Sequence, residues 1–160
     1  MRKLILLSIV FLPSLFGQAS STCNLVKQDE ADALMGGASR QVAVGNLGCG
    51  YSLRTAGLNL SITVMDMGTS AKTIWDSLKD EARRRNWLIG EEPGMGSDSF
   101  AELIKRSAES SAGKAGFVVL KGTKVLQIFV TDSAAKADIA GKKEMLDKMR
   151  PVAQKAVQRL

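Results

Sequence analysis

The sequence contains no histidine, which removes the commonest general base near neutral pH and the commonest protein ligand for metals. Most hydrolase triads are thereby excluded. Cysteine is also scarce, because Cys23 and Cys49 are the only two, whereas a structural zinc site usually needs four nitrogen or sulfur ligands. We therefore expect no catalytic residue, no metal site and no cofactor in this chain.

Long apolar runs are missing everywhere except near the beginning. Met1-Arg2-Lys3 precede an almost wholly apolar segment from Leu4 to Phe16, and Gly17-Gln18-Ala19 follow it. This basic, hydrophobic and small-residue order is typical of a secretory signal peptide. The apolar segment is interrupted by Pro13 and is shorter than the roughly 18 residues expected of a membrane-spanning helix. We predict an exported protein, periplasmic or extracellular, without a transmembrane span after signal cleavage.

The signal peptide is assigned to residues 1–19 and a single α+β domain to residues 20–160, with Ser20 as the first mature residue. Cleavage after Ser21 would also satisfy the small-residue rule. Removal of residues 1–19 deletes two basic side chains and lowers the formal net charge from +6 to +4. The remaining length suits one domain with a substantial core.

Two cysteines in an exported chain predict a Cys23–Cys49 disulfide more readily than a metal or catalytic pair. The alternative is a lipid anchor at Cys23, as in bacterial lipoproteins. A lipoprotein signal normally has a leucine-like residue three positions before the cysteine and Gly, Ala or Ser directly before it. Ser20 and Thr22 occupy these positions here, so the sequence favours the disulfide over lipidation.

Residue spacing predicts three helices. Residues Gln28–Met35 contain no Gly, Pro or β-branched residue. Residues Ser70–Arg85 carry one apolar stripe, and we expect Trp75 on that stripe to belong to the core and not to a binding platform. Residues Met145–Leu160 repeat apolar side chains at helical spacing, although Pro151 is expected to interrupt and kink this helix.

Strand-like segments lie between these helices. In the last of them, Leu126, Ile128 and Val130 alternate with Val125 and Phe129, so this strand is apolar on both sides. The order of helix, strands, helix, strands and helix predicts an α+β fold with a predominantly antiparallel sheet that helices cover on both faces. The predicted strands are Ser39–Val44, Cys49–Arg54, a strand from Leu58, Ser99–Ala108, Ala115–Lys121 and Lys124–Thr131.

Short motifs follow one another along the mature chain. They are Cys23-Asn24-Leu25-Val26, Glu30-Ala31, Ala33-Leu34-Met35-Gly36, Cys49-Gly50-Tyr51 and Pro93-Gly94-Met95-Gly96-Ser97-Asp98. In this order the chain resembles a group of small exported bacterial domains of unknown function, many of them lipoproteins, with a PsbP-like α/β/α sandwich. Lys27 departs from the pattern, since a Ser or Thr helix cap would be usual there. The resemblance implies a fold and a compartment, and it transfers no active site.

One sequence pattern hints at a serine nucleophile. Ser111 and Lys114 have the Ser-x-x-Lys spacing in which a lysine can activate a serine within the first turn of a helix. Here the two residues belong to a predicted turn of small residues, and the companion motifs are only superficially similar. We assign no catalytic dyad to them.

Carboxylates offer a second route to catalysis. Glu91, Glu92, Asp98 and Glu102 cluster in sequence, and paired carboxylates can hydrolyse glycosides when they face each other across a cleft. We expect Glu91 and Glu92 to lie in a solvated loop and Glu102 on an exposed strand face. A carboxylate-dependent hydrolase is therefore kept only as an alternative.

The favoured interpretation is a secreted or periplasmic, non-enzymatic binding or accessory domain. Its partner would be an envelope protein or an anionic envelope polymer, and not nucleic acid, which exported proteins rarely meet. As an alternative, basic residues could attach the domain to anionic lipid or cell-wall polymer. The candidate residues are Gly94, Met95, Gly96, Ser97 and Asp98 for a binding loop, and Arg83, Arg84 and Arg85 for an anion-binding face.

Overall fold

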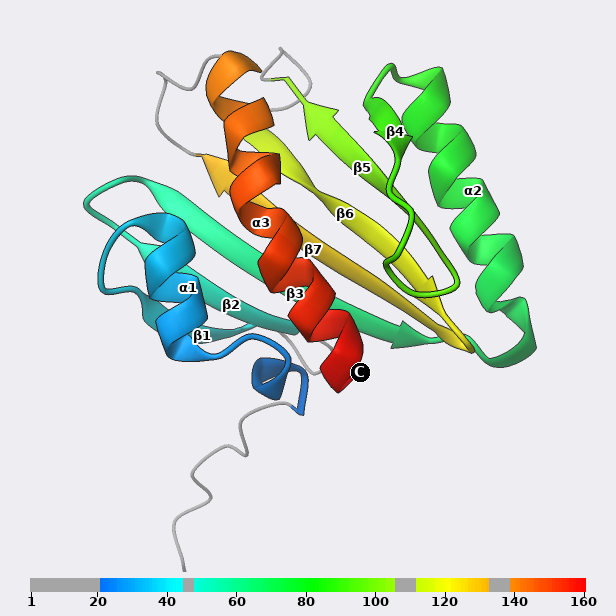
Figure 1. Cartoon of the computed structure of the whole chain (residues 1–160), viewed down its shortest axis with the longest axis horizontal. Helices are drawn as coiled ribbons and strands as arrows, with labels where there is room; N and C mark the ends of the chain where they lie inside the picture. Colours follow the sequence, from blue (N-terminus) through cyan, green and yellow to red (C-terminus); the bar gives the residue numbers. More distant parts are fainter. Residues whose placement is uncertain (1–20, 45–47, 106–111, 133–138) are drawn as a thin grey trace, which may run out of the picture.

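The computed structural model describes residues 21–44, 48–105, 112–132 and 139–160 (Figure 1). The predicted signal peptide and Ser20 lie outside this part of the chain. Short 3-10 turns at Ser21–Asn24 and Gly68–Ser70 accompany three α-helices and seven β-strands. The helices are α1 (Gln28–Met35), α2 (Ala71–Arg84) and α3 (Ile139–Arg159), and the strands are β1 (Arg40–Val44), β2 (Gly48–Leu53), β3 (Leu58–Asp66), β4 (Leu88–Glu91), β5 (Asp98–Ile104), β6 (Gly113–Lys121) and β7 (Lys124–Asp132).

The seven strands form one sheet in the order β1-β2-β3-β7-β6-β5-β4, and every neighbouring pair is antiparallel. This confirms the predicted α+β class and the antiparallel sheet. β1 and β4 form the two edges. The long pairing of β3 with β7 joins the N-terminal meander to the C-terminal hairpin. The sequence pattern did not predict that these two strands pair. Strand β4 was not predicted at all.

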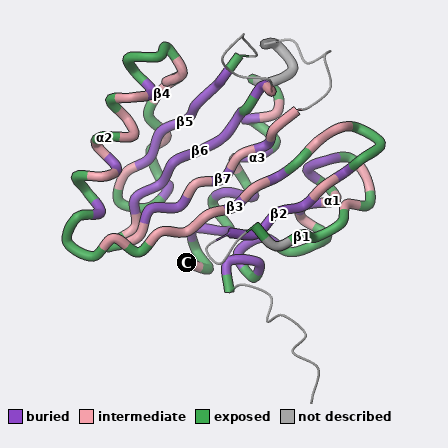
Figure 2. The backbone as a smooth tube through the Cα atoms, turned by 180° about the vertical axis from the view of Figure 1, so that it is seen from behind, coloured by how far each residue is buried: buried purple, intermediate pink, exposed green. Residues whose placement is uncertain are grey.

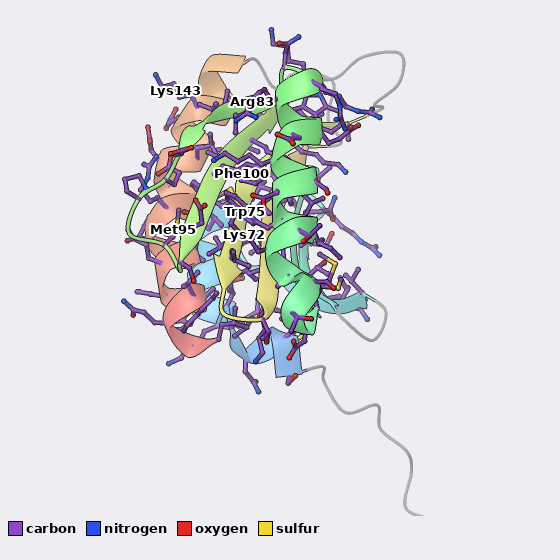
Figure 3. The ribbon with its side chains drawn as sticks, turned by 90° about the vertical axis from the view of Figure 1, so that its right-hand side faces the viewer. Lys72, Trp75, Arg83, Met95, Phe100 and Lys143 are labelled. Atoms are coloured by element: carbon purple, nitrogen blue, oxygen red, sulfur yellow. A yellow bond between two sulfur atoms is a disulfide. The ribbon has the colours of Figure 1, made fainter. Side chains whose placement is uncertain are left out.

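Alternate residues of the central strands belong to two separate cores. Phe117 and Val119 of β6 pack in the cluster that contains α1 and α3, whereas Val118 and Leu120 pack in the cluster that contains α2. In Figure 3, α2 and α3 lie on different sides of the sheet. We call the side that carries α1 and α3 the front face and the side that carries α2 the back face.

Trp75 lies at the centre of the back-face core. It is 1% exposed and packs edge-on against Phe100, with ring centroids 5.4 Å apart. Figure 3 shows both rings between α2 and the sheet. The prediction that Trp75 is a core residue is confirmed.

The disulfide links the N-terminal turn to β2. The Sγ atoms of Cys23 and Cys49 are 2.12 Å apart, and both residues are buried. Near this bond, the Tyr51 hydroxyl donates to the carbonyl oxygen of Val26. The predicted Cys23–Cys49 pairing is confirmed.

Two helix predictions need correction. The third helix begins at Ile139, earlier than predicted, and it continues through Pro151 to Arg159 without interruption. Pro151 lies on the exposed side of this helix, where the missing N–H group leaves no buried acceptor unsatisfied.

In the described residues, no helix is long and apolar enough to cross a membrane.

Candidate binding site

The predicted binding loop is held firmly against the end of the sheet. Met95 is 2% exposed and belongs to the front-face core, and Figure 3 shows it on the α3 side of the sheet. The Ser97 N–H group donates to the carbonyl oxygen of Leu120 at 2.7 Å. A Cβ atom at Gly96 would lie 2.3 Å from that same oxygen, and the backbone has φ +65°, so glycine is needed for this approach. Asp98 begins β5. The loop therefore closes one end of the front-face core.

The three arginines of the candidate anion site are paired along α2. Arg83 contacts Asp80 at 2.8 Å, Arg84 contacts Glu81 at 2.6 Å, and Arg85 also pairs with Glu81. The i,i+4 spacing on a helix predicts Asp80–Arg84 and Glu81–Arg85 pairs. The second pair forms, whereas Asp80 contacts Arg83. Such exposed pairs contribute little stability, but they neutralise much of the local positive charge.

The four sequence-clustered carboxylates do not converge. Glu91 contacts Lys79 of α2 at 2.6 Å, whereas both oxygens of Glu92 accept hydrogen bonds from Arg150 of α3 at 2.9 Å. These two acids therefore turn toward helices in different cores. Glu102 pairs with neither Lys79 nor Arg150.

The structure instead places a pocket on the back face, beside α2. Figure 2, which views the molecule from behind, shows α2 over the β4–β5 side of the sheet and no described helix over β3 and β2. Val42 and Val44 of β1 are correspondingly 39% and 45% exposed on this face. At the border between the covered and open halves lies a pocket of about 280 Å³, which α2, β3, β5, β6 and β7 line.

Glu102 forms part of the wall of this pocket and is only 7% exposed. Phe100 and Ile104 precede and follow it on the same face of β5, so its surroundings on the strand are apolar. The predicted exposure of Glu102 is wrong, because α2 and the residues after it cover this part of the face. A charged residue between two apolar residues of one strand face was the available sequence signal.

The Glu102 carboxyl has no hydrogen-bond or ion-pair partner in the described part of the chain. Among the described residues, Trp75 Nε1 is the side-chain polar atom that is fully enclosed and has no hydrogen-bond partner. The Glu102 oxygens therefore keep some contact with solvent. The carboxyl thus faces the pocket. Burial raises the pKa of Glu102 to about 7, and the positive charge of Lys114 opposes this rise.

Lys114 approaches the same pocket from β6. It is exposed and pairs across the strands with Ile104, two positions from the Gly116 that opposes Glu102. No ion pair to Lys114 occurs among the described residues. Lys114 of the Ser-x-x-Lys spacing lies on strand β6 and not in the predicted turn. Ser111 lies outside the described residues.

The remaining wall combines hydroxyl, amide and aromatic groups. Ser61 and Thr63 come from β3, and Gln127 and Phe129 come from β7. A Cβ atom at Gly116 would lie 2.4 Å from a ring carbon of Phe129, so the absence of a side chain lets this ring lie across β6 beside Glu102. One row of back-face residues runs from β1 to β4 through Val42, Gly50, Ser61, Phe129, Gly116, Glu102 and Leu88.

In comparison with known proteins, the chain matches no protein-family model and no curated protein. The site is therefore judged on its own geometry and chemistry. It offers one buried acid, one exposed base, neutral hydrogen-bonding groups and the aromatic side chains of Phe129 and Trp87. In the described residues, no group of three or more Cys, Asp or Glu side chains is arranged to hold a metal ion.

Proposed function

We propose that this chain is an exported, non-enzymatic binding or accessory domain that holds its ligand on the half-open back face. The observation that carries the proposal is the Glu102 carboxyl, which is buried, has no partner in the described chain and faces a pocket. Burying an ionisable group without a partner opposes folding. A ligand that satisfies the group would explain why the group is there.

Export is supported by the disulfide and by the signal-like residues 1–19. A disulfide persists in oxidising compartments such as the periplasm or the exterior. The Cys23–Cys49 bond supports a disulfide over a thioether-linked lipid at Cys23. A PsbP-like sandwich is the fold that we propose, and the packing of α3 and α2 against alternate residues of β6 supports it.

A binding role is favoured over hydrolysis because the candidate catalytic groups are held apart. Glu91 and Glu92 are engaged by Lys79 and Arg150 in different cores. Glu81 lines the same pocket as Glu102, but it is paired with Arg84 and Arg85. Attachment to an anionic envelope polymer through Arg83–Arg85 is less well supported, since these arginines are already paired with Asp80 and Glu81.

A ligand screen by NMR tests the proposal. The exported protein, labelled with ¹⁵N, is exposed to a library of small cationic, anionic and neutral organic compounds. We expect binders to shift the amide signals of Ser61, Gln127 and Phe129, and to be recovered chemically unchanged. Shifts confined to the Gly94–Asp98 loop, an absence of any binder, or turnover of a bound compound would each contradict it.

A further inference from the structure

We propose that the back-face pocket recognises a small organic ligand through an ammonium group that pairs with the Glu102 carboxylate. This inference rests on the proposed binding function and deepens it by naming the chemical class of the ligand. The pocket volume of about 280 Å³ lies at the small end for ligand sites, which typically enclose about 300–1,000 Å³. The ligand is therefore a small molecule.

An ammonium ion supplies what the Glu102 carboxylate lacks. An ionised carboxylate accepts hydrogen bonds and donates none, and its charge is poorly solvated where Glu102 lies. An ammonium group carries three N–H donors and the opposite charge. A neutral alcohol would satisfy the hydrogen bond alone, and an anion would add repulsion.

The surroundings of Glu102 suit the rest of such a ligand. The ring of Phe129 lies over Gly116, which opposes Glu102 in the strand pairing, so an ammonium group at Glu102 would lie close to an aromatic face. Ser61 and Gln127 provide hydroxyl and amide groups for polar substituents on the same ligand.

The other charged side chains of the pocket, Lys114 and Glu81, do not neutralise Glu102 in the way that we propose for the ligand. Lys114 is exposed at the rim, and water solvates its ammonium group without the help of Glu102. Glu81 also lines the pocket, but Arg84 and Arg85 already occupy its two oxygens. Glu102 is therefore the acid in this pocket that remains available to a ligand.

Three probes of nearly equal shape test the charge preference. Benzylamine, benzyl alcohol and benzoate are titrated into the ¹⁵N-labelled exported protein at pH 8. We expect benzylammonium to bind at least about tenfold more tightly than benzyl alcohol, because it adds a charge-assisted hydrogen bond, which is stronger than a neutral one. Equal or tighter binding of the alcohol or of benzoate would overturn the inference.

Variants identify the carboxylate that is responsible. Glu102→Gln should abolish the preference for benzylammonium, whereas the matched change Glu144→Gln, on an exposed part of α3, should retain it. Lys114→Gln should tighten benzylammonium binding several-fold by removing a like charge. Loss of the preference in Glu144→Gln, or weaker binding in Lys114→Gln, contradicts the assignment to Glu102.

The pH dependence gives a readout that needs no variant. Since only the ionised carboxylate pairs with the ammonium, benzylammonium binding should strengthen from pH 6 to pH 8, through the Glu102 pKa of about 7. The charged groups around this pocket are Lys114 and the Glu81 cluster with Arg84 and Arg85. A pH-independent preference would overturn the inference even if Glu102→Gln failed to fold.

The two proposals fail in different ways. If all three probes bind the pocket with similar affinity, the binding function stands and the ammonium preference is wrong. If none of them shifts the back-face signals and the library contains no other binder, both proposals fall.

Discussion

Glu102 occupies a position where an apolar side chain would be expected. Its folded-state pKa of about 7 lies above the ordinary glutamate value of 4.5, so folding favours the protonated carboxyl. The resulting contribution to stability is fully present below about pH 4.5 and is lost as the pH rises through about 7. As the pH rises through neutrality, ionisation of Glu102 thus lowers the stability of the fold and places a negative charge in the pocket.

Glu102→Gln removes the ionisable group and keeps the shape. We expect the variant to be more stable than the parent by roughly 1–3 kcal/mol at pH 8, where the buried carboxylate is ionised, and nearly equal in stability at pH 5. Urea unfolding at the two pH values measures the difference. Glu144→Gln, an exposed control, should change neither value. A destabilised variant at pH 8 would mean that the carboxylate has a stabilising partner.

On the scale of elements, Glu30 ties α1 to the end of α3. Its side chain is 10% exposed and accepts hydrogen bonds from Arg159 and from the backbone N–H group of Lys27, with Lys155 at 3.4 Å. The Arg159 hydrogen bond is the main reason that the pKa of Glu30 falls to about 2. Arg159 also donates to the carbonyl oxygen of Leu25 at 2.9 Å. The last turn of α3 is therefore bonded to the segment that precedes α1.

Glu30→Gln should loosen this junction. We expect a loss of about 1–2 kcal/mol of unfolding free energy at pH 7, which is less than the full pKa shift would give because water screens the pair. Since the folded pKa is depressed, the stabilisation is present above about pH 4.5 and is lost as the pH falls through about 2. Denaturant unfolding from pH 7 to pH 2 follows this loss.

The control for this experiment is Glu91→Gln. Glu91 also pairs with a lysine of another element, but its side chain is 71% exposed. Its replacement should change stability by less than about 0.5 kcal/mol, as for other exposed pairs. An effect as large as that of Glu30→Gln would show that exposure does not distinguish the two pairs.

On the scale of the molecule, the disulfide closes a loop with a sequence separation of 26 residues. The loop contains α1 and β1 and brings the N-terminal turn onto β2, where Cys49 is fully buried. The bond restricts the unfolded chain more than the folded one, which is the usual entropic account of its stabilisation.

Reduction of the Cys23–Cys49 bond should lower the free energy of unfolding by roughly 3–4 kcal/mol, as measured by urea unfolding with and without reductant. Intact mass before and after alkylation provides the control. The exported protein should begin at Ser20 and take up no alkyl group until it is reduced. A mass that begins at Cys23 with added acyl chains would instead identify a lipoprotein.

The sequence by itself determined the features that depend on neighbouring residues. The apolar stripe that includes Trp75 predicted α2, the alternation from Val125 to Val130 predicted β7, and the two cysteines predicted their own bond. The α+β class followed from the order of these elements. The helix and the strand follow from the local spacing of apolar residues, and two cysteines allow a single pairing. None of these predictions required knowledge of which distant segments pack together.

Only the tertiary structure decided which side chains are covered. Met95 fills a core because its loop folds onto the end of β6, and Glu102 is buried because α2 packs over one half of the back face. The pairing of β3 with β7, which places Ser61 beside Phe129, joins segments far apart in the chain. Burial and pairing of this kind depend on packing between segments that are distant in sequence. The local spacing of apolar residues carries no information about such packing. The pocket is therefore a property of the assembled sheet and helix.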